Sequence, residues 1–78
     1  MDINELIKKI EAEFEDLKPG SLKPESRFRK VLDWNSVNAL TIIALVDSDY
    51  DVLLTAEDFM KSETVQDVYN IIVSRMKK

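Results

Sequence analysis

Hydrophobic residues at the start of the chain recur at spacings of three and four, which is typical of one face of an amphipathic helix. Asp2 precedes the pattern and Glu5 follows three residues later, a variant of the capping box at a helix start. Pro19-Gly20 ends the pattern, because proline is disfavoured inside a helix and glycine readily takes a positive φ angle. We therefore expect a first helix over residues 3–17. Its apolar face consists of Ile3, Leu6, Ile7, Ile10, Phe14 and Leu17.

Residues 18–34 show no sustained hydrophobic period, which predicts a long loop. A connection of this length in a small domain is usually functional or held in place by buried side chains. Pro24-Glu25-Ser26 predicts a short turn within it. We expect four apolar side chains to anchor the loop on the helices, namely Leu22, Phe28, Val31 and Leu32.

Apolar residues outnumber polar ones from Ser36 to about Asp49, and a helical arrangement separates them into two faces. The face expected in the core consists of Ala39, Ile42, Ile43, Val46 and Tyr50. The opposite face consists of Val37, Thr41, Ala44 and Ser48. This second face is small, weakly polar and exposed, so it suits contact with another protein.

The last third of the chain predicts two further helices. Thr55 caps a short one, with acidic residues in its first turn, and Thr64 caps a longer one that ends in Arg75 and two lysines. The apolar stripe of the longer helix consists of Val65, Val68, Tyr69, Ile72, Val73 and Met76. Val52-Leu53-Leu54 is strand-like but has no partner for pairing.

These elements predict an all-α fold. We expect a small four-helix bundle, with three longer helices and one short helix, and a long loop between the first and second helices. A chain of 78 residues buries only a modest core, so residues 1–78 are expected to form a single domain.

Acidic residues are concentrated in the middle of the chain. Residues 31–58 contain Asp and Glu but no Lys or Arg, so this segment repels nucleic-acid phosphates and attracts basic protein surfaces. The longest uncharged stretch, Trp34 to Val46, is too short to cross a bilayer, and the start of the chain lacks the pattern of a signal sequence. We expect a cytoplasmic monomer that binds neither nucleic acid nor membranes.

The chain has no Cys and no His, which removes thiolate nucleophiles, zinc–thiolate sites and the usual general base. Asp47, Asp49 and Asp51 alternate as in a calcium loop, but the glycine and the final glutamate of such loops are missing, so we expect no metal site. Ser36 has two interpretations. In the first, Asn35 or Ser36 simply caps the helix, and in the second Ser36 is an exposed hydroxyl that another enzyme activates, because the chain offers no base of its own.

The order of long helix, long loop, helix opening on serine, short helix and helix resembles the acyl carrier protein family. Leu32-Asp-Trp-Asn-Ser36-Val is similar to the family pattern Leu-Gly-x-Asp-Ser-Leu, whose serine carries 4′-phosphopantetheine. The resemblance extends over nearly the whole chain. Three further stretches carry it: Leu22-Lys-Pro-Glu-Ser26-Arg-Phe28, Val46-Asp-Ser-Asp-Tyr50-Asp-Val52, and Glu63-Thr-Val-Gln-Asp-Val68.

The resemblance implies a carrier that other enzymes modify and load, not an enzyme. Ser36 is the expected attachment point of a covalent 4′-phosphopantetheine arm, with Mg²⁺ required only while a phosphopantetheinyl transferase attaches it. The arm would hold acyl intermediates as thioesters in fatty acid, lipid or polyketide-like biosynthesis, with acyl-loading and condensing enzymes as further partners. The residues expected to contact these partners are Asn35, Val37, Asn38, Thr41, Ala44 and Asp47.

The chain departs from the family pattern next to the serine. Asn35 replaces the aspartate that the family associates with magnesium-dependent attachment, and Asn38 and Thr41 stand where acidic residues are common. These departures indicate a specialised carrier with its own partners. Two other functions stay open: a peptidyl or aryl carrier of a peptide-type assembly line, and a degenerate carrier-like binding module. Trp34 either covers the edge of the core or contacts the arm or an incoming enzyme.

Overall fold

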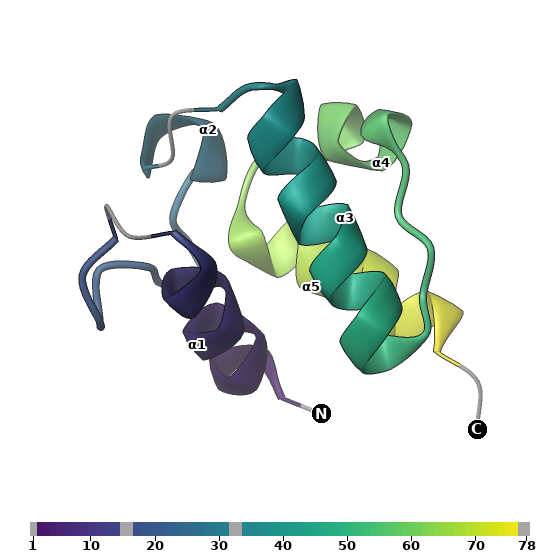
Figure 1. The fold of residues 1–78 in the computed structure, drawn as a ribbon, viewed down its shortest axis with the longest axis horizontal. Helices are drawn as coiled ribbons and strands as arrows, with labels where there is room; N and C mark the ends of the chain where they lie inside the picture. The colour runs from purple at the N-terminus through teal and green to yellow at the C-terminus, as the bar shows by residue number, and fades with distance from the viewer. Residues whose placement is uncertain (1, 15–16, 32–33, 77–78) are drawn as a thin grey trace.

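The computed structural model describes residues 2–14, 17–31 and 34–76. These residues form helices and no strand, and their one β-type contact is an isolated antiparallel bridge between Arg27 and Thr64. The all-α fold class is confirmed, with one helical turn, α2, added inside the predicted loop (Figure 1). The helices are α1 (Ile3–Glu13), α2 (Phe28–Val31), α3 (Ser36–Tyr50), α4 (Ala56–Lys61) and α5 (Val65–Arg75).

Helix α1 is shorter than predicted. Asp2 caps it by accepting the Glu5 N–H at 2.9 Å, but the helix ends at Glu13 and Phe14 is already extended. The predicted end at residue 17 is therefore wrong. The chain turns back early because the Glu11 carboxylate accepts two loop N–H groups, those of Gly20 and Leu22, each at 3.0 Å. Gly20 has the positive φ, +87°, that the sequence predicted for it, although it lies beyond the end of the helix.

Two of the four predicted loop anchors are buried. Leu22 and Phe28 reach the core, whereas Val31 is 38 % exposed, so its prediction is wrong. Val31 stands in the single turn of α2, whose buried side is taken by Phe28. The fourth, Leu32, lies outside the described residues. The predicted turn is confirmed, because the Ser26 N–H donates to the Lys23 carbonyl at 3.0 Å.

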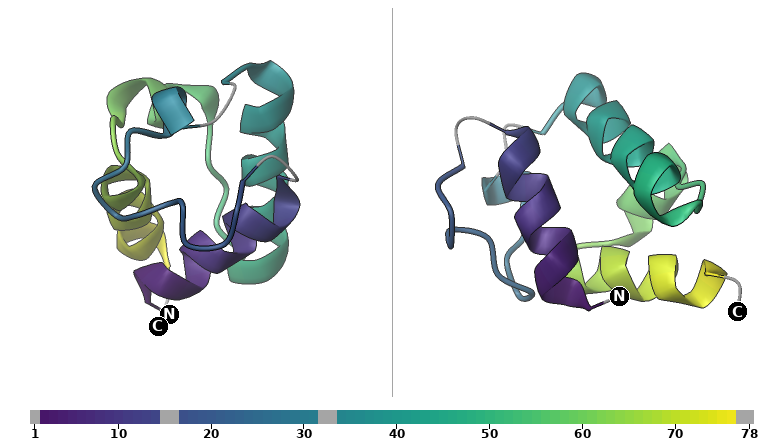
Figure 2. Two further views of the ribbon diagram at one scale, coloured as in Figure 1. Left: turned by 90° about the vertical axis from the view of Figure 1, so that its left-hand side faces the viewer. Right: turned by 60° about the horizontal axis from the view of Figure 1, so that its bottom comes forward.

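The three longer helices surround one core (Figure 2). Helix α1 packs against both α3 and α5, and α4 packs against α5. The core faces predicted for α3 and α5 are largely confirmed, with Val73 as an exception at 43 % exposed. The strand-like run makes no pair, but two of its residues fill the core. The buried apolar residues are Leu6, Ile7, Ile10, Leu22, Phe28, Ile42, Val46, Val52, Leu54, Phe59, Val65, Val68 and Ile72.

Thr55 and Thr64 cap α4 and α5, as the sequence predicted, and each belongs to a capping box. In α4 the partner of Thr55 is Asp58, which is buried and also forms a two-pronged ion pair with Arg75 of α5, at 2.6 and 2.8 Å. The Arg75 guanidinium, more than any other group, lowers the pKa of the Asp58 carboxyl to about 2. This pair ties the short helix to the last turn of α5. None of the helices in the described parts of the chain is long and apolar enough to cross a membrane.

Candidate functional site

Asn35 caps α3, and Ser36 is the first residue of the helix. The Asn35 backbone is extended, its side-chain oxygen accepts the Asn38 N–H at 2.9 Å, and its carbonyl accepts the Ala39 N–H at 3.0 Å. The capping role that the sequence left open between two residues therefore belongs to Asn35. Asparagine and aspartate cap helices about equally well, so Asn35 supports the helix start without bringing a negative charge to it.

Ser36 presents an exposed hydroxyl at this helix start. Within the described residues, no hydrogen bond engages the hydroxyl oxygen, and no carboxylate lines the cleft beside it. The first N–H groups of a helix point outward and carry the positive end of its dipole, which favours an anion bonded at this position. The geometry therefore fits a phosphate ester on Ser36 Oγ formed by a separate enzyme.

A cleft opens beside Ser36, between α2, the first turn of α3, and α4. Its lining residues are Arg29, Trp34, Asn35, Ser36, Ala39, Ala56, Phe59 and Met60. Apart from Arg29, they are uncharged. The cleft is large enough and open enough to take the start of a flexible chain attached to the serine, so the residues present fit a phosphopantetheine group.

Trp34 packs on two phenylalanines at the edge of the core. The centroid of its ring system lies 4.8 Å from that of Phe28 and 5.1 Å from that of Phe59. The structural interpretation of Trp34 is confirmed, because it covers the contact between α2 and α4. It also forms a wall of the cleft beside Ser36, so the same residue is placed to touch an attached group.

The residues predicted to contact partners all lie on α3 or at its start. Asn35 precedes Ser36 as the helix cap, and the other predicted contact residues follow along the helix. Val37 is 67 % exposed. Thr41 is partly buried and donates its hydroxyl to the Val37 carbonyl at 3.0 Å, and with Ala44 it lines a shallow groove next to Glu13 at the end of α1. Asn38 is partly buried in the first turn.

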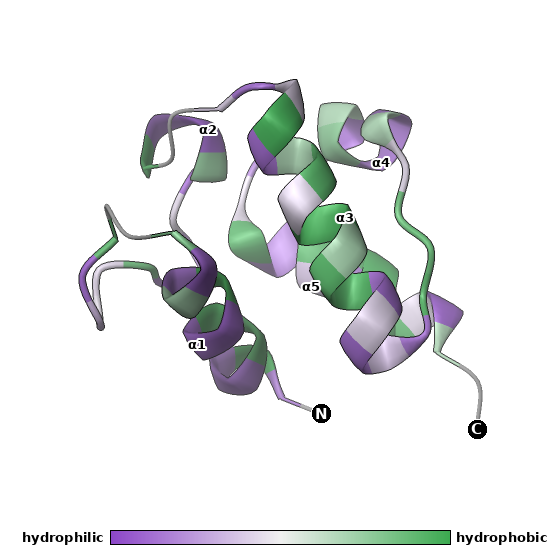
Figure 3. Ribbon diagram, viewed as in Figure 1, coloured by the Kyte–Doolittle hydropathy of each residue, from purple (hydrophilic) through white to green (hydrophobic). Residues whose placement is uncertain are grey.

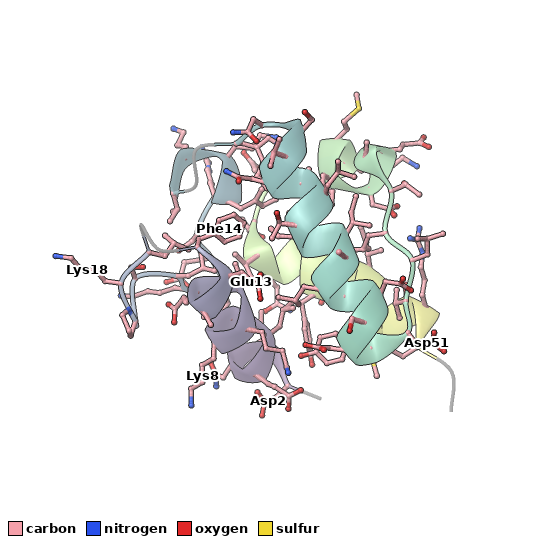
Figure 4. The ribbon with its side chains drawn as sticks, viewed as in Figure 1. Asp2, Lys8, Glu13, Phe14, Lys18 and Asp51 are labelled. Atoms are coloured by element: carbon pink, nitrogen blue, oxygen red, sulfur yellow. The ribbon has the colours of Figure 1, made fainter. Side chains whose placement is uncertain are left out.

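The acidic end of α3 lies away from the serine. A helix rises 1.5 Å per residue, so Asp47 is about 16 Å along the axis from Ser36. Asp49 is paired with Lys9 of α1 at 3.2 Å, and Asp51 ends the helix in a left-handed conformation (Figure 4). No three acidic side chains in the described ranges are close enough together to hold a metal ion.

The sequence missed three residues that the structure places beside Ser36, namely Leu40, Met60 and Arg29. Leu40 is 62 % exposed and lies one helical turn beyond Ser36, on the same side, so the spacing of four could have found it. Met60 and Arg29 come close only through the tertiary fold, and no local pattern marks them. Figure 3 shows the outward side of α3 as largely hydrophobic through its middle and hydrophilic in its last turn.

The comparisons with known proteins include a family model and a relative that span the site. Residues 4–72 match the model of a family described as phosphopantetheine attachment site. An acyl carrier protein of Thermosynechococcus vestitus is 28 % identical over 75 residues, which cover 96 % of this chain and 93 % of that relative. Both matches cover α3 and the cleft beside it.

Proposed function

The chain belongs to the acyl carrier protein family, and on that premise we propose that Ser36 carries a covalent 4′-phosphopantetheine arm that holds acyl groups as thioesters. The observation that supports this most is an exposed serine hydroxyl at the first turn of α3, opening onto a cleft. The arm supplies a thiol, which the chain cannot supply because it has no cysteine. The protein is then a carrier, and the chemistry is done by the enzymes that visit it.

Ser36 takes part in attachment only as an acceptor. Its oxygen loses a proton to a base of the transferase and forms the new bond to the pantetheine-bearing phosphorus of coenzyme A. The pyrophosphate bond of coenzyme A breaks, adenosine 3′,5′-bisphosphate leaves, and the Mg²⁺ also belongs to the transferase. The helix start favours the resulting negative phosphodiester through its outward N–H groups and its dipole. Asn35 contributes a neutral amide to this helix start, so it does not repel the phosphate as a carboxylate would.

We propose that the transferase and the acyl-loading and condensing enzymes dock over α3, where they meet Asn35, Val37, Asn38, Thr41 and Ala44. Residues 36–46 carry no charge, so the surface nearest Ser36 offers apolar contacts, and the acidic Asp47 guides basic partners only at the far end. Leu40 belongs to this docking surface because it is exposed beside Ser36. The protein is expected to act in the cytoplasm as a monomer.

The experiment is an in vitro modification assay. The purified protein is incubated with coenzyme A, Mg²⁺ and a phosphopantetheinyl transferase, and its intact mass is measured. The wild type is expected to gain one phosphopantetheine and Ser36→Ala none. Ser48→Ala is the matched control, because Ser48 is also an exposed serine of α3, and it should be modified like the wild type. No addition to the wild type with several transferases would exclude the proposal.

A binding module that carries no arm is the second candidate. Asn35 favours it, since this residue replaces the aspartate expected before the serine. The same mass measurement separates the two candidates. The mass measurement does not identify the cargo. Identifying the adenylating or transferring enzyme that loads the arm would distinguish an acyl group from an aminoacyl or aryl group.

A further inference from the structure

Arg29 is the charged residue of the cleft beside Ser36. It stands on α2, and its side chain lines the cleft together with Trp34, Met60 and the start of α3. The other described residues that line the cleft are neutral, so among the described residues Arg29 is the cation next to an anion bonded to Ser36.

The Arg29 side chain is held in place from three sides. Nη1 donates to the Ser62 carbonyl at 2.9 Å and Nη2 donates to the Phe59 carbonyl, both at the end of α4. The guanidinium carbon lies 5.0 Å from the centroid of the Phe28 ring. These contacts fix the plane of the guanidinium before any ligand arrives.

The charge of Arg29 is not neutralised by a carboxylate among the residues that the structure describes. A guanidinium also has more N–H donors than the two carbonyls accept. Arg29 therefore combines a fixed position, a positive charge and spare donors, which is what recognition of a phosphate group requires.

We infer that Arg29 is a positioning residue for the arm: it binds a phosphodiester oxygen next to Ser36 and directs the arm into the cleft over α4. The apolar methyl groups of the arm that follow the phosphate then pack on Trp34 and Met60. This inference rests on the proposed function, because it needs the arm on Ser36. Beyond the proposed function, Arg29 sets a preferred direction for the arm, into the cleft over α4.

The test uses the holo-protein, and the intact mass is checked first for every variant. Nuclear Overhauser contacts between the arm methyl protons and the Trp34 ring report the position of the arm, and Trp34 is the sole tryptophan of the chain, so its emission gives a second readout. In the wild type these contacts are expected, with emission shifted to shorter wavelength relative to the apo-protein. Arg29→Gln should lose both effects.

Lys30→Gln is the matched control. Lys30 is the next residue of α2, is exposed and does not line the cleft, so removing its charge should leave both readouts unchanged. Met60→Ser is a second variant that spares the bonds from Arg29 to α4. Met60 is 77 % exposed, so the fold should tolerate the change, and the contacts from the arm to Trp34 should weaken.

The outcomes separate this inference from the proposed function. A wild-type protein that gains no arm by mass overturns both. A fully loaded wild type without contacts between the arm and Trp34 overturns the inference alone, as does a loaded, folded Arg29→Gln variant that keeps them. Loss of the contacts in Arg29→Gln and Met60→Ser, with retention in Lys30→Gln, supports it.

Discussion

Asn35 caps a helix as an aspartate would, but it carries no negative charge. Its side-chain oxygen caps α3 through the Asn38 N–H at 2.9 Å, as a carboxylate oxygen would. It brings no negative charge to the helix start, and it offers a transferase no carboxylate for a metal ion. Substitutions of Asn35 can therefore change the free energy of unfolding and the rate of phosphopantetheine attachment independently.

Asn35→Asp is expected to preserve the fold and raise the modification rate with transferases that act on aspartate-containing carriers. The added charge at the positive end of the helix dipole should stabilise the protein by about 0.3–1 kcal/mol. Asn35→Ala should lower the free energy of unfolding by about 1 kcal/mol, because it removes the cap. Denaturant unfolding and the initial rate of mass gain measure the two effects. An unchanged rate in Asn35→Asp would show that the asparagine does not limit modification.

At the residue scale, the sequence identified Ser36 because its neighbours along the chain carry the pattern. It could not identify Arg29 or Met60, whose places in the cleft depend on how α2 and α4 pack. The role of Trp34 was open for a similar reason, since one of its two ring contacts, with Phe59, comes from α4, which is distant in sequence.

At the element scale, the ion pair between Asp58 and Arg75 makes the contact between α4 and α5 sensitive to acid. The pKa of Asp58 is lowered from 3.8 to about 2 in the folded protein, so the folded state holds this proton less tightly than the unfolded state. The stabilisation is complete above the unfolded pKa and is lost as the pH falls from about 4 to 2, and the shift corresponds to about 2 kcal/mol.

Asp58→Asn should therefore lower the free energy of unfolding by about 2 kcal/mol at neutral pH and reduce the loss of stability between pH 4 and pH 2. Chemical denaturation at several pH values measures both. Some acid sensitivity should persist in the variant, because the N–H groups of Glu63 and Thr64 lower the pKa of Asp67 as well. A variant with the same pH profile as the wild type would contradict this assignment.

Helix α3 carries the proposed docking surface, and Leu40 tests it. Leu40→Asp places a charge on an exposed apolar position, so the free energy of unfolding should change by less than about 0.5 kcal/mol. Loading by partner enzymes should fall several-fold, measured as the rate of acyl transfer to the holo-protein. Val73→Asp, at an exposed valine of α5, is the control and should load normally. Equal loading of both variants would remove Leu40 from the docking surface.

Helix starts were easier to predict than helix ends. Asp2, Thr55 and Thr64 cap their helices through local side chains, so the sequence alone placed these starts. The end of α1 depends on Glu11, which accepts loop N–H groups nine and eleven residues further along the chain. A local pattern does not contain such a contact, and the predicted helix ran on to residue 17.

At the scale of the whole molecule, the described core residues leave little space at the centre of the bundle. The void lined by Ile10, Ile42 and Val68 among others measures about 10 Å³, close to the least that one water molecule needs. An acyl chain of several carbons can occupy this void only if the residues that line it move apart. We predict that hydrogen exchange of core amides in α3 and α5 changes between the unloaded and the acyl-loaded protein. Unchanged exchange would mean that the chain stays outside.

The fold class followed from the sequence because three long apolar stripes require one another for burial, and α1, α3 and α5 surround the core accordingly. The sequence could not show where the charges lie in space. Among the described acidic residues of the middle segment, Asp49 is paired with Lys9 at the far end of α3, and Asp58 is paired with Arg75 of α5. The uncharged run after the serine can be read from the sequence, but the position of Arg29 in the cleft beside it depends on the tertiary fold.

The central claim is that Ser36 carries a phosphopantetheine arm, and the most direct test is the intact mass of the protein purified from its own host, followed by peptide mapping. The account predicts a mass increase of one phosphopantetheine, with or without an acyl group, located on the peptide that contains Ser36. Protein that is entirely unmodified in its host, or modified on a different serine, would contradict it.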